Sequence, residues 1–384
     1  MNKPVIVNIN EKVDTHEMEF TLSNVDVCIA NAIRRTLLTN IDTVVFRTSP
    51  HEKNDAHIEI NTSRLNNEII KQRLSCIPIH LKDHKLCENL ELHINVQNSS
   101  KDVQYVTSEH FKIYDTLNQT YLNKEAKEIF PPNKYNKYID FVRLRPQISD
   151  NLEIPGEELK MTCKMCVSNA KENAMFNVVC NSSYGFTIDS AKVKQMWKLK
   201  ENELSGQNIN KGSEQYDFAK RDFELLEAKR CFKTDKFNRP NSFDFNIQSV
   251  GVYTCYELLN KACLYLMQDL DVFIENVSKN HESIIYESNV NILHSYDVLL
   301  KEKDATFGKI LEYALYTNYY ESDVSSEEKL TYCGYLKKHP HDDFCIIRLA
   351  FNDDKPSLFI SELLKKSCLY LKKLFMIIND KFIE

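Results

Sequence analysis

The pattern of apolar and polar positions divides the chain into segments with two different periods. Near the start, residues 5–9 (VIVNI) and 18–22 (MEFTL) alternate with a period of two, which is typical of half-buried strands. Ser23 and Asn24 are favoured N-cap residue types. The apolar residues that follow recur every four positions, at Val25, Ile29, Ile33 and Leu37. This region therefore predicts two strands and then an amphipathic helix.

The pattern changes between residues 47 and 235, where short alternating stretches are separated by polar loops that carry proline. These stretches are HIEI, LELHINV, HFKIY, YIDFVRL and KMTCKMCV. We interpret this region as a β-rich inserted domain. Its last part predicts a loop and then a charged helix, in which Phe218, Phe223, Leu226 and Arg230 fall at helical spacing.

A strand (FDFNIQSVG) and a long helix follow the insertion. The apolar residues of this helix recur every three or four positions: Leu258, Leu259, Ala262, Leu266, Leu270, Phe273 and Val277. The stretch KNHESIIYESN predicts a linker. We therefore expect residues 1–46 and 236–288 to form one discontinuous domain around the insertion.

The last unit, residues 289–384, repeats the pattern of the first. It predicts strands at NVNIL and YDVLLKE, a helix at DATFGKILEYALY, strands at TYCGYLKKHP and FCIIRLAF, and a long helix from about Pro356. Residues 29–37 can be laid over residues 307–315 with the apolar positions in register. The sequence thus predicts an α+β fold with two related halves, each of antiparallel strands plus two helices.

Composition narrows the function. The chain has 384 residues, 42% hydrophobic and 27% charged, which is typical of a globular protein. The apolar runs are all shorter than the roughly 20 residues that cross a bilayer, so we expect no membrane association. A net charge of −6 disfavours sequence-wide DNA binding. The 12 cysteines are spread along the chain, as expected for reduced thiols in a cytosolic setting.

Two clusters of residues, together with the glycines, were considered as sites for a metal, a phosphate group or catalysis. Cys163 and Cys166 form a CxxC with Cys180 further on, but residues three apart on a strand point to opposite faces. The segment KKHPHDDF (residues 337–344) fits a turn between two strands. The seven glycines form no phosphate-binding loop. We therefore predict no catalytic residue, no metal site and no cofactor.

Several segments, in the same order along the chain, resemble the alpha-type assembly subunits of multisubunit RNA polymerases. NVDVCIANAIRRTLLTNI resembles the first helix of bacterial alpha, archaeal D and the third-largest eukaryotic subunit. IIKQRLSCIPI, YIDFVRLRP with GEELKMTCKMCVSNAKENAMFNVV, and FDFNIQSVG are similar to later family segments. The final unit resembles the small partner of that subunit, the archaeal L or eleventh eukaryotic subunit, through KEKDATFGKILEYAL, YCGYLKKHP and FCIIRLAF.

The resemblance implies a fusion of both partners in one chain, as large DNA viruses with cytoplasmic transcription encode. It implies two dimerisation modules that pair within the chain, and fusion raises their effective concentration. The residues expected to make this pairing are apolar helix positions: Ile29, Ile33, Leu37, Phe307, Leu311, Leu315, Leu371 and Phe375.

The same resemblance implies the partners. Asn31, Arg34 and Arg35 are expected to contact the second-largest, beta-like subunit, since guanidinium groups suit desolvated contacts. The equivalent positions in the second half are Glu312 and Tyr313, which suggests that this half faces the largest, beta-prime-like subunit. Smaller polymerase subunits are further expected partners. The expected location is the cytoplasm of a host cell, with packaging into the virus particle left open.

The sequence disfavours two rival functions, because it lacks the features that each would need. A self-contained enzyme would need convergent acids, a nucleophile or a phosphate loop, and a DNA-binding regulator would need a basic face with interleaved aromatic residues. A transcription-associated interaction factor outside the core polymerase is the alternative closest to our reading. The doublets Lys365/Lys366 and Lys372/Lys373 fit either a basic surface for acidic partners or the solvated back of a helix, and we favour the second interpretation.

Overall fold

The computed structural model describes residues 3–147 and 155–383, which divide into two compact units. Unit 1 comprises Met1–Leu37, Asn181–Gln248 and Cys255–Glu384, and unit 2 comprises Leu38–Cys180 with Ser249–Thr254. The predicted insertion at 47–235 differs from unit 2 mainly at its end. Strand β12 (Val179–Phe186) pairs with β13 (Ser242–Ser249) of the first sheet, so most of β12 and everything between these two strands belong to unit 1.

The first half of unit 1 is built on a four-stranded antiparallel sheet. β1 (Val5–Lys12) and β2 (Glu17–Ser23) are followed by α1 (Val27–Thr39), and β12 and β13 are followed by α6 (Cys255–Ile284). The strand order is β1-β2-β13-β12. Apolar residues pair across β2 and β13, with Phe20 opposite Phe245 and Leu22 opposite Phe243, and all four are buried. This alternation explains the predicted strands.

The N-cap of helix α1 lies two residues after Asn24, the later of the two predicted cap positions. Ser23 still pairs in β2, and Asn24 has φ 63°, so the chain turns before the helix begins. Asp26 is the capping residue, because its Oδ1 accepts a hydrogen bond from the Cys28 amide at 2.8 Å. The predicted apolar stripe is confirmed, since Val25, Ile29, Ile33 and Leu37 are all buried.

The second half of unit 1 has a sheet of its own. β14 (Ile285–Glu287), β15 (Ser295–Lys301), β16 (Leu330–Leu336) and β17 (Phe344–Phe351) pair antiparallel in the order β14-β15-β17-β16. Helix α7 (Ala305–Leu315), with a π-helical turn after it, follows β15, and α8 (Ser357–Asn379) follows β17.

One predicted strand of this half is wrong. Residues 289–293 (NVNIL) form the loop between β14 and β15, where Leu293 is 82% exposed. The first strand is instead Ile285–Glu287, which lies inside the predicted linker. Helix α6 ends at Ile284, so it passes directly into this strand.

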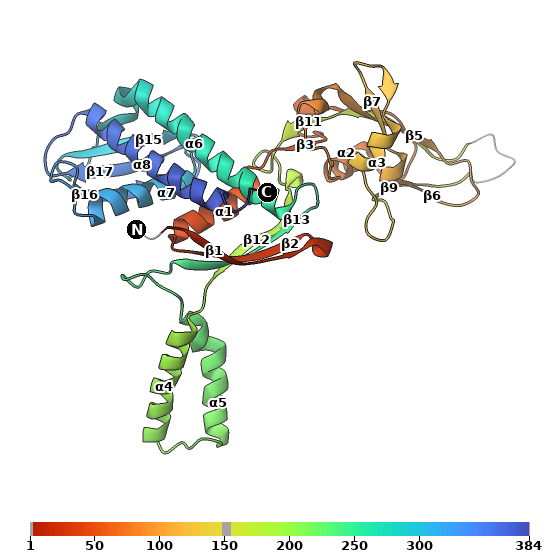
Figure 1. The fold of residues 1–384 in the computed structure, drawn as a ribbon. Helices are drawn as coiled ribbons and strands as arrows, with labels where there is room; N and C mark the ends of the chain where they lie inside the picture. Colours follow the sequence, from red (N-terminus) through yellow and green to blue (C-terminus); the bar gives the residue numbers. More distant parts are fainter. Residues whose placement is uncertain (1–2, 148–154, 384) are drawn as a thin grey trace. The chain divides into compact units, whose positions relative to one another are not determined.

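Both halves have the same element order, β-β-α-β-β-α. In each sheet the strands lie in the order first, second, fourth, third along the chain. The predicted α+β fold class with antiparallel sheets is confirmed. Helices α6 and α8, the last element of each half, pack along each other, as Figure 1 shows. Their facing stripes are apolar, and all the predicted core positions of α6 are buried.

A helical hairpin interrupts the first half between β12 and β13. It consists of α4 (Ser190–Gly206) and α5 (Glu214–Asp222), which continues into a π-helical turn at Phe223–Glu227. The charged helix predicted in this region corresponds to α5. Helix α4 was not predicted. Within the described ranges, no helix is both long and apolar enough to span a membrane.

Unit 2 is β-rich. A five-stranded antiparallel sheet has the order β4 (Ala56–Asn61), β10 (Glu158–Lys164), β5 (Leu90–Gln97), β7 (Lys112–Asp115) and β8 (Thr120–Tyr121). Two further pairs are β3 (Thr43–Val45) with β11 (Cys166–Ser168), and β6 (Gln104–Thr107) with β9 (Asp140–Leu144). Helices α2 (Asn67–Ser75) and α3 (Asn123–Ile129) complete the unit, and both contribute to its core.

A buried carboxylate anchors the end of β9. Glu157 Oε2 accepts from the Arg145 amide at 2.7 Å, and Oε1 accepts from Arg145 Nε at 2.6 Å. Burial alone would raise the pKa of Glu157, but these hydrogen bonds and the guanidinium charge outweigh it and lower the pKa.

Candidate protein-interaction site

The predicted contact residues of α1 lie on its partly exposed face. Arg34 donates from Nε and Nη2 to Oδ1 of Asn31, one turn earlier, at 3.0 and 2.9 Å. The carbonyl of Arg34 accepts a hydrogen bond from Ser182 of β12. Among the residues that the structure describes, Arg34 has no carboxylate partner. The guanidinium group of Arg34 is therefore positioned by a neutral amide, and its positive charge is available to pair with a carboxylate of another protein.

Arg35 is directed toward the second half of the unit. Its Nη2 lies 3.2 Å from Oδ2 of Asp304, and both side chains are about half exposed. Asp304 is also the N-cap of α7, where its Oδ1 accepts from the Thr306 and Phe307 amides. Arg35 therefore links the two halves, a contact that the sequence did not reveal.

On α7 the position that matches Arg34 carries the opposite charge, as Glu312. Lys309 Nζ lies 2.6 Å from Glu312 Oε2, so the pair at positions 309 and 312 matches the pair Asn31 and Arg34 in the overlay. Glu312 Oε1 also accepts from the Tyr335 amide of β16 at 3.0 Å. The two helices thus present a fixed guanidinium at one site and a fixed carboxylate at the other, and the two surfaces are chemically different.

The position on α7 that matches Arg35 is also different, because Tyr313 replaces a cation with a neutral side chain. Burial raises the pKa of the Tyr313 hydroxyl strongly, and the neighbouring Tyr370 of α8 contributes to the same shift. Tyr313 is therefore a neutral group at the junction of α7 and α8.

Among the described residues, four ion pairs and three ring contacts join the two halves; two of the ring contacts place Phe382, after α8, against Phe20 of β2 and Tyr256 of α6. The Phe273 ring of α6 lies 5.2 Å from the Phe307 ring of α7 in an edge-to-face arrangement. The four ion pairs across the junction are Arg35 with Asp304, Asp269 with Lys303, Asp271 with Lys372, and Arg239 with Glu321. The Asp269 and Lys303 side chains are 21% and 16% exposed, so this pair is the best shielded from water.

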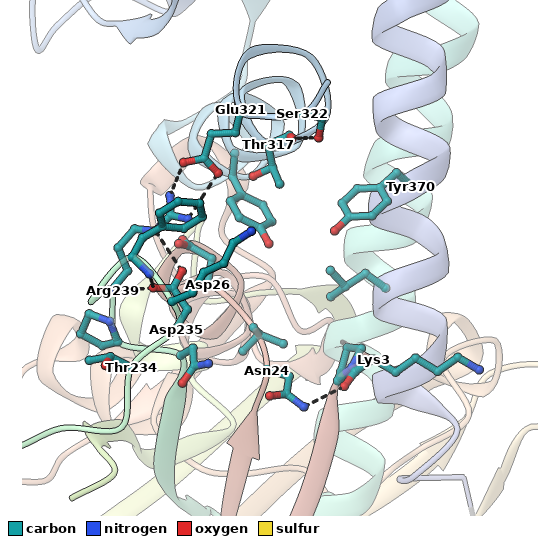
Figure 2. Close-up of a pocket in the computed structure, with 18 of the residues that line it drawn as sticks. Lys3, Asn24, Asp26, Thr234, Asp235, Arg239, Thr317, Glu321, Ser322 and Tyr370 are labelled. Carbon is teal, nitrogen blue, oxygen red and sulfur yellow. Dashed lines mark hydrogen bonds and ion pairs between the residues drawn. The ribbon is translucent and has the colours of Figure 1, made fainter. Parts of the chain in front are cut away.

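The residue Arg239 lies on one side of a groove between the halves. It donates to both carboxylate oxygens of Glu321 at 2.9 and 3.3 Å and to Asp235 at 3.1 Å, as Figure 2 shows. The groove has a volume of about 930 Å³, and Tyr370 of α8 lines it. Burial would raise the pKa of Asp235, but hydrogen bonds from the amides and guanidinium of its own loop outweigh it and lower the pKa.

The predicted pairing residues are buried without exception. Ile29, Ile33, Leu37, Phe307, Leu311, Leu315, Leu371 and Phe375 have exposed fractions of 3% or less. For Phe307 the ring contact with α6 identifies a partner in the other half. For the other residues the pairing role stays a prediction.

The cysteines singled out in the sequence donate to carbonyl oxygens. Cys163 bonds to its neighbour's carbonyl, Cys166 to Val45 of β3, and Cys180 to Ser249. Burial raises the pKa of the Cys163 and Cys166 thiols, which disfavours the thiolate form that binds zinc. Within the described ranges, no three His, Cys, Asp or Glu side chains gather as metal ligands.

The lysine doublets of α8 were predicted to be solvated, and two of their four lysines instead form ion pairs. Lys372 is 25% exposed and bonds to both oxygens of Asp271 on α6 at 2.6 and 2.8 Å. Lys366 pairs with Glu328 at 2.7 Å. One lysine of each doublet is therefore engaged, because α8 lies beside α6 and the segment before β16.

A module that occurs twice in one unit, with the last helix of each copy packed on the other, has the architecture of a protein-pairing domain. The chain belongs to the RNA polymerase Rpb3/Rpb11 dimerisation domain family, whose model matches residues 19–270. The match begins within β2, includes the inserted unit and ends within α6, so it lies inside the first half and leaves out β1.

Individual relatives agree with this assignment. The chain is 23% identical over 328 residues to the "Conjugation stage-specific protein" of Tetrahymena thermophila, covering 72% of this chain and 96% of that protein. It is 24% identical over 302 residues to "DNA-directed RNA polymerases I and III subunit rpac1" of Dictyostelium discoideum, covering 69% and 79%. It is 22% identical over 296 residues to "DNA-directed RNA polymerases IV and V subunit 3B" of Arabidopsis thaliana, covering 69% and 89%. The predicted likeness to alpha-like polymerase subunits is confirmed at this level.

Proposed function

We propose that this chain is a non-catalytic assembly subunit of a DNA-directed RNA polymerase that carries both partners of the alpha-like heterodimer. The observation that supports this most is the repeated β-β-α-β-β-α module, with α6 of one copy packed on α8 of the other. The family match covers only the first copy. In this proposal the second copy would serve as the small partner.

The two outward helices would serve different large subunits. On α1, Arg34 is held by the amide of Asn31 and available for a carboxylate, which suits an interface with the second-largest subunit. On α7, the equivalent site offers Glu312 with Lys309, which suits a different surface, that of the largest subunit. Smaller polymerase subunits would bind around this platform. The chain would thus nucleate assembly, and the polymerisation chemistry would reside in the completed complex.

The cellular setting is part of the same proposal. The fusion of both partners in one chain resembles what large DNA viruses with cytoplasmic transcription encode, and this supports a role in the cytoplasm of an infected cell. Immunofluorescence of infected cells tests this directly. Signal confined to the nucleus would contradict it.

Capture of the second-largest subunit by the tagged chain tests the role of α1. Arg34→Ala should weaken capture at least tenfold and leave the melting temperature unchanged, because Arg34 has no carboxylate partner in the described part of the chain. Unlike Arg34→Ala, Arg35→Ala removes an ion pair within the chain, the exposed pair with Asp304. This variant is expected to lower the free energy of unfolding by at most about 1 kcal/mol.

The matched control replaces Lys337 and Lys338, adjacent exposed cations in the turn before β17. This control should capture the large subunit as well as the unaltered chain. Equal capture by Arg34→Ala and the control would remove the role assigned to α1.

A further inference from the structure

Strand β12 forms a second wall beside the partly exposed face of α1. The Ser182 hydroxyl of this strand donates to the Arg34 carbonyl at 3.3 Å, so β12 runs next to α1 at the position of Arg34. Both elements are labelled in Figure 1. In the order β1-β2-β13-β12, the strand lies at the edge of its sheet. The surface beside Arg34 is therefore made by a helix and by an edge strand.

Tyr184 follows Ser182 by two residues and therefore lies on the same face of β12. Its ring packs on Phe243 and Phe245 of β13, with centroids 5.3 and 5.4 Å away. The hydroxyl, in contrast, forms no hydrogen bond with any described residue. Burial raises the pKa of the Tyr184 hydroxyl, and the positive charge of Arg34 opposes that shift, so the two groups lie close enough to interact.

The guanidinium group of Arg34 also has free donors at this place. Two of its five N–H groups donate to Asn31 Oδ1, which leaves three without a partner in the described part of the chain. To reach Asn31 the side chain folds back by one turn, toward the start of α1. The charge of Asp26, at that end of the helix, also acts on Tyr184. The guanidinium and the phenol therefore offer their free N–H and O–H groups at one site.

Exposed apolar side chains flank these donors. Val27 lies four residues before Asn31 and seven before Arg34, so the three share one face of α1. Its side chain is 39% exposed. On β12, Phe186 is 37% exposed, and its ring lies 6.5 Å from that of Tyr184. Arg and Tyr beside exposed apolar groups are typical of the residues that dominate binding at protein interfaces.

The charges at the site select the group that fits there. Asp26 is the carboxylate whose charge reaches Tyr184, and its Oδ1 already accepts from the Cys28 amide. Among the described residues here, Arg34 is the charged group that lacks an opposite partner. One carboxylate neutralises it and has two oxygens, one for the guanidinium and one for the phenol. A phosphodiester carries the same charge, but the apolar flanks suit protein side chains better than sugar and phosphate.

We propose that Tyr184 is a second anchor of the large-subunit interface, and that Arg34 and Tyr184 together bind one carboxylate of the partner. This carboxylate belongs to an Asp or Glu that lies between apolar residues, whose side chains contact Val27 and Phe186. The inference rests on the proposed function, in which α1 faces the second-largest polymerase subunit. It adds residues of β12 to that interface and defines the kind of segment that binds there.

Tyr184→Phe tests this inference, because the change removes the hydroxyl and keeps the ring on Phe243 and Phe245. The tagged full chain with this change should melt at the same temperature as the unaltered chain. It should capture the second-largest subunit about tenfold more weakly, the loss typical of a hydrogen bond to a charged group. The matched control, Tyr286→Phe, removes the hydroxyl of an exposed tyrosine in β14 and should capture normally.

Two further measurements identify the bound group. Capture by the double variant, Arg34→Ala with Tyr184→Phe, should be reduced by less than the product of the two single losses, because both side chains bind the same carboxylate. A photo-crosslinking amino acid placed at Val27, in the chain purified with its bound partners, should couple to the second-largest subunit. The coupled segment should contain Asp or Glu between apolar residues.

The outcomes separate this inference from the proposed function. Single losses that simply multiply in the double variant overturn the inference, as does cross-linking to nucleic acid or to a segment without an acidic residue. If the unaltered chain captures the large subunit and Tyr184→Phe captures it equally well, the inference alone is wrong. If the unaltered chain does not capture the subunit, the proposed function is wrong and the inference fails with it.

Discussion

The ring contact between Phe273 and Phe307 offers a direct measure of how strongly the two halves are coupled. Phe273 belongs to α6 of the first half and Phe307 to α7 of the second, and their centroids lie 5.2 Å apart. Both side chains are buried, with exposed fractions of 4% and 3%. Replacing each by leucine, alone and together, makes a double-mutant cycle across the junction.

The expected magnitudes follow from the contacts. Each Phe→Leu change keeps an apolar side chain and should lower the free energy of unfolding by about 1–1.5 kcal/mol. The edge-to-face contact itself contributes about 0.5–1.5 kcal/mol beyond burial. Phe307→Leu also removes the contact with Lys303 Nζ, which lies 5.0 Å from the ring centroid. That loss occurs in both the single and the double variant and cancels in the cycle. The double variant should therefore be more stable than the sum of the single changes predicts by about 0.5–1.5 kcal/mol.

Denaturant unfolding followed by Trp197 fluorescence is a suitable assay, because this tryptophan lies in the same unit as the ring pair. The control cycle pairs Phe307 with Phe245, whose ring contacts among the described residues are Phe20 and Tyr184. This control should be additive within about 0.3–0.5 kcal/mol. If the Phe273–Phe307 cycle is equally additive, the halves are not coupled through this contact and our reasoning is refuted.

Three further predictions concern the fold. Gly308→Ala should destabilise the unit by about 1–3 kcal/mol, because the added Cβ would lie 2.3 Å from the Tyr335 ring. The control Gly206→Ala has nothing within 4 Å of the added Cβ and should be neutral or stabilising, so equal melting temperatures of the two variants would contradict the prediction. Glu157→Gln should lower stability at pH 7 by about 1.5–3 kcal/mol. The folded-state pKa of Glu157 is depressed, so its contribution to the free energy of unfolding is present above the carboxyl's ordinary pKa near 4.3 and is lost as pH falls through the folded-state pKa. Unfolding curves measured over a pH series test this, and an equal difference in stability between variant and parent at pH 3 and pH 7 would refute it. Two chains divided after residue 284, where the second sheet begins, should form a one-to-one complex by native mass spectrometry, and two folded monomers at micromolar concentration would disprove the pairing.

The strongly periodic segments could be predicted from the sequence. The apolar stripe of α6 and the four-residue repeat from Val25 to Leu37 identify buried helix faces, because one face of each helix lies in a core. The repeat of strands and helices in the two halves was predicted for the same reason. Strand β14 was missed because its three residues lie within a polar stretch, and the alternation in NVNIL belongs to an exposed loop.

The remaining features depend on tertiary neighbours. Helix α4 has exposed apolar residues and a single buried leucine, so it lacks the periodic stripe that reveals other helices. Strands β12 and β13 pair although a long connection separates them in the sequence. The alternation of apolar and polar residues predicts that each is a strand but does not specify which strand it pairs with. The Arg35–Asp304 pair joins residues 269 positions apart. Arg34 and Arg35 looked alike in the sequence, and only their contacts distinguish an available guanidinium from one that faces the second half.

Purification of the chain from its native source, followed by quantitative mass spectrometry, tests the central claim most directly. As an assembly subunit that carries both alpha-like partners, the chain should co-purify with the two large polymerase subunits, one copy of each per copy of the chain. No separate small-partner subunit should be present at that stoichiometry. A chain recovered without the large subunits, or with an additional stoichiometric small partner, would contradict the proposed function.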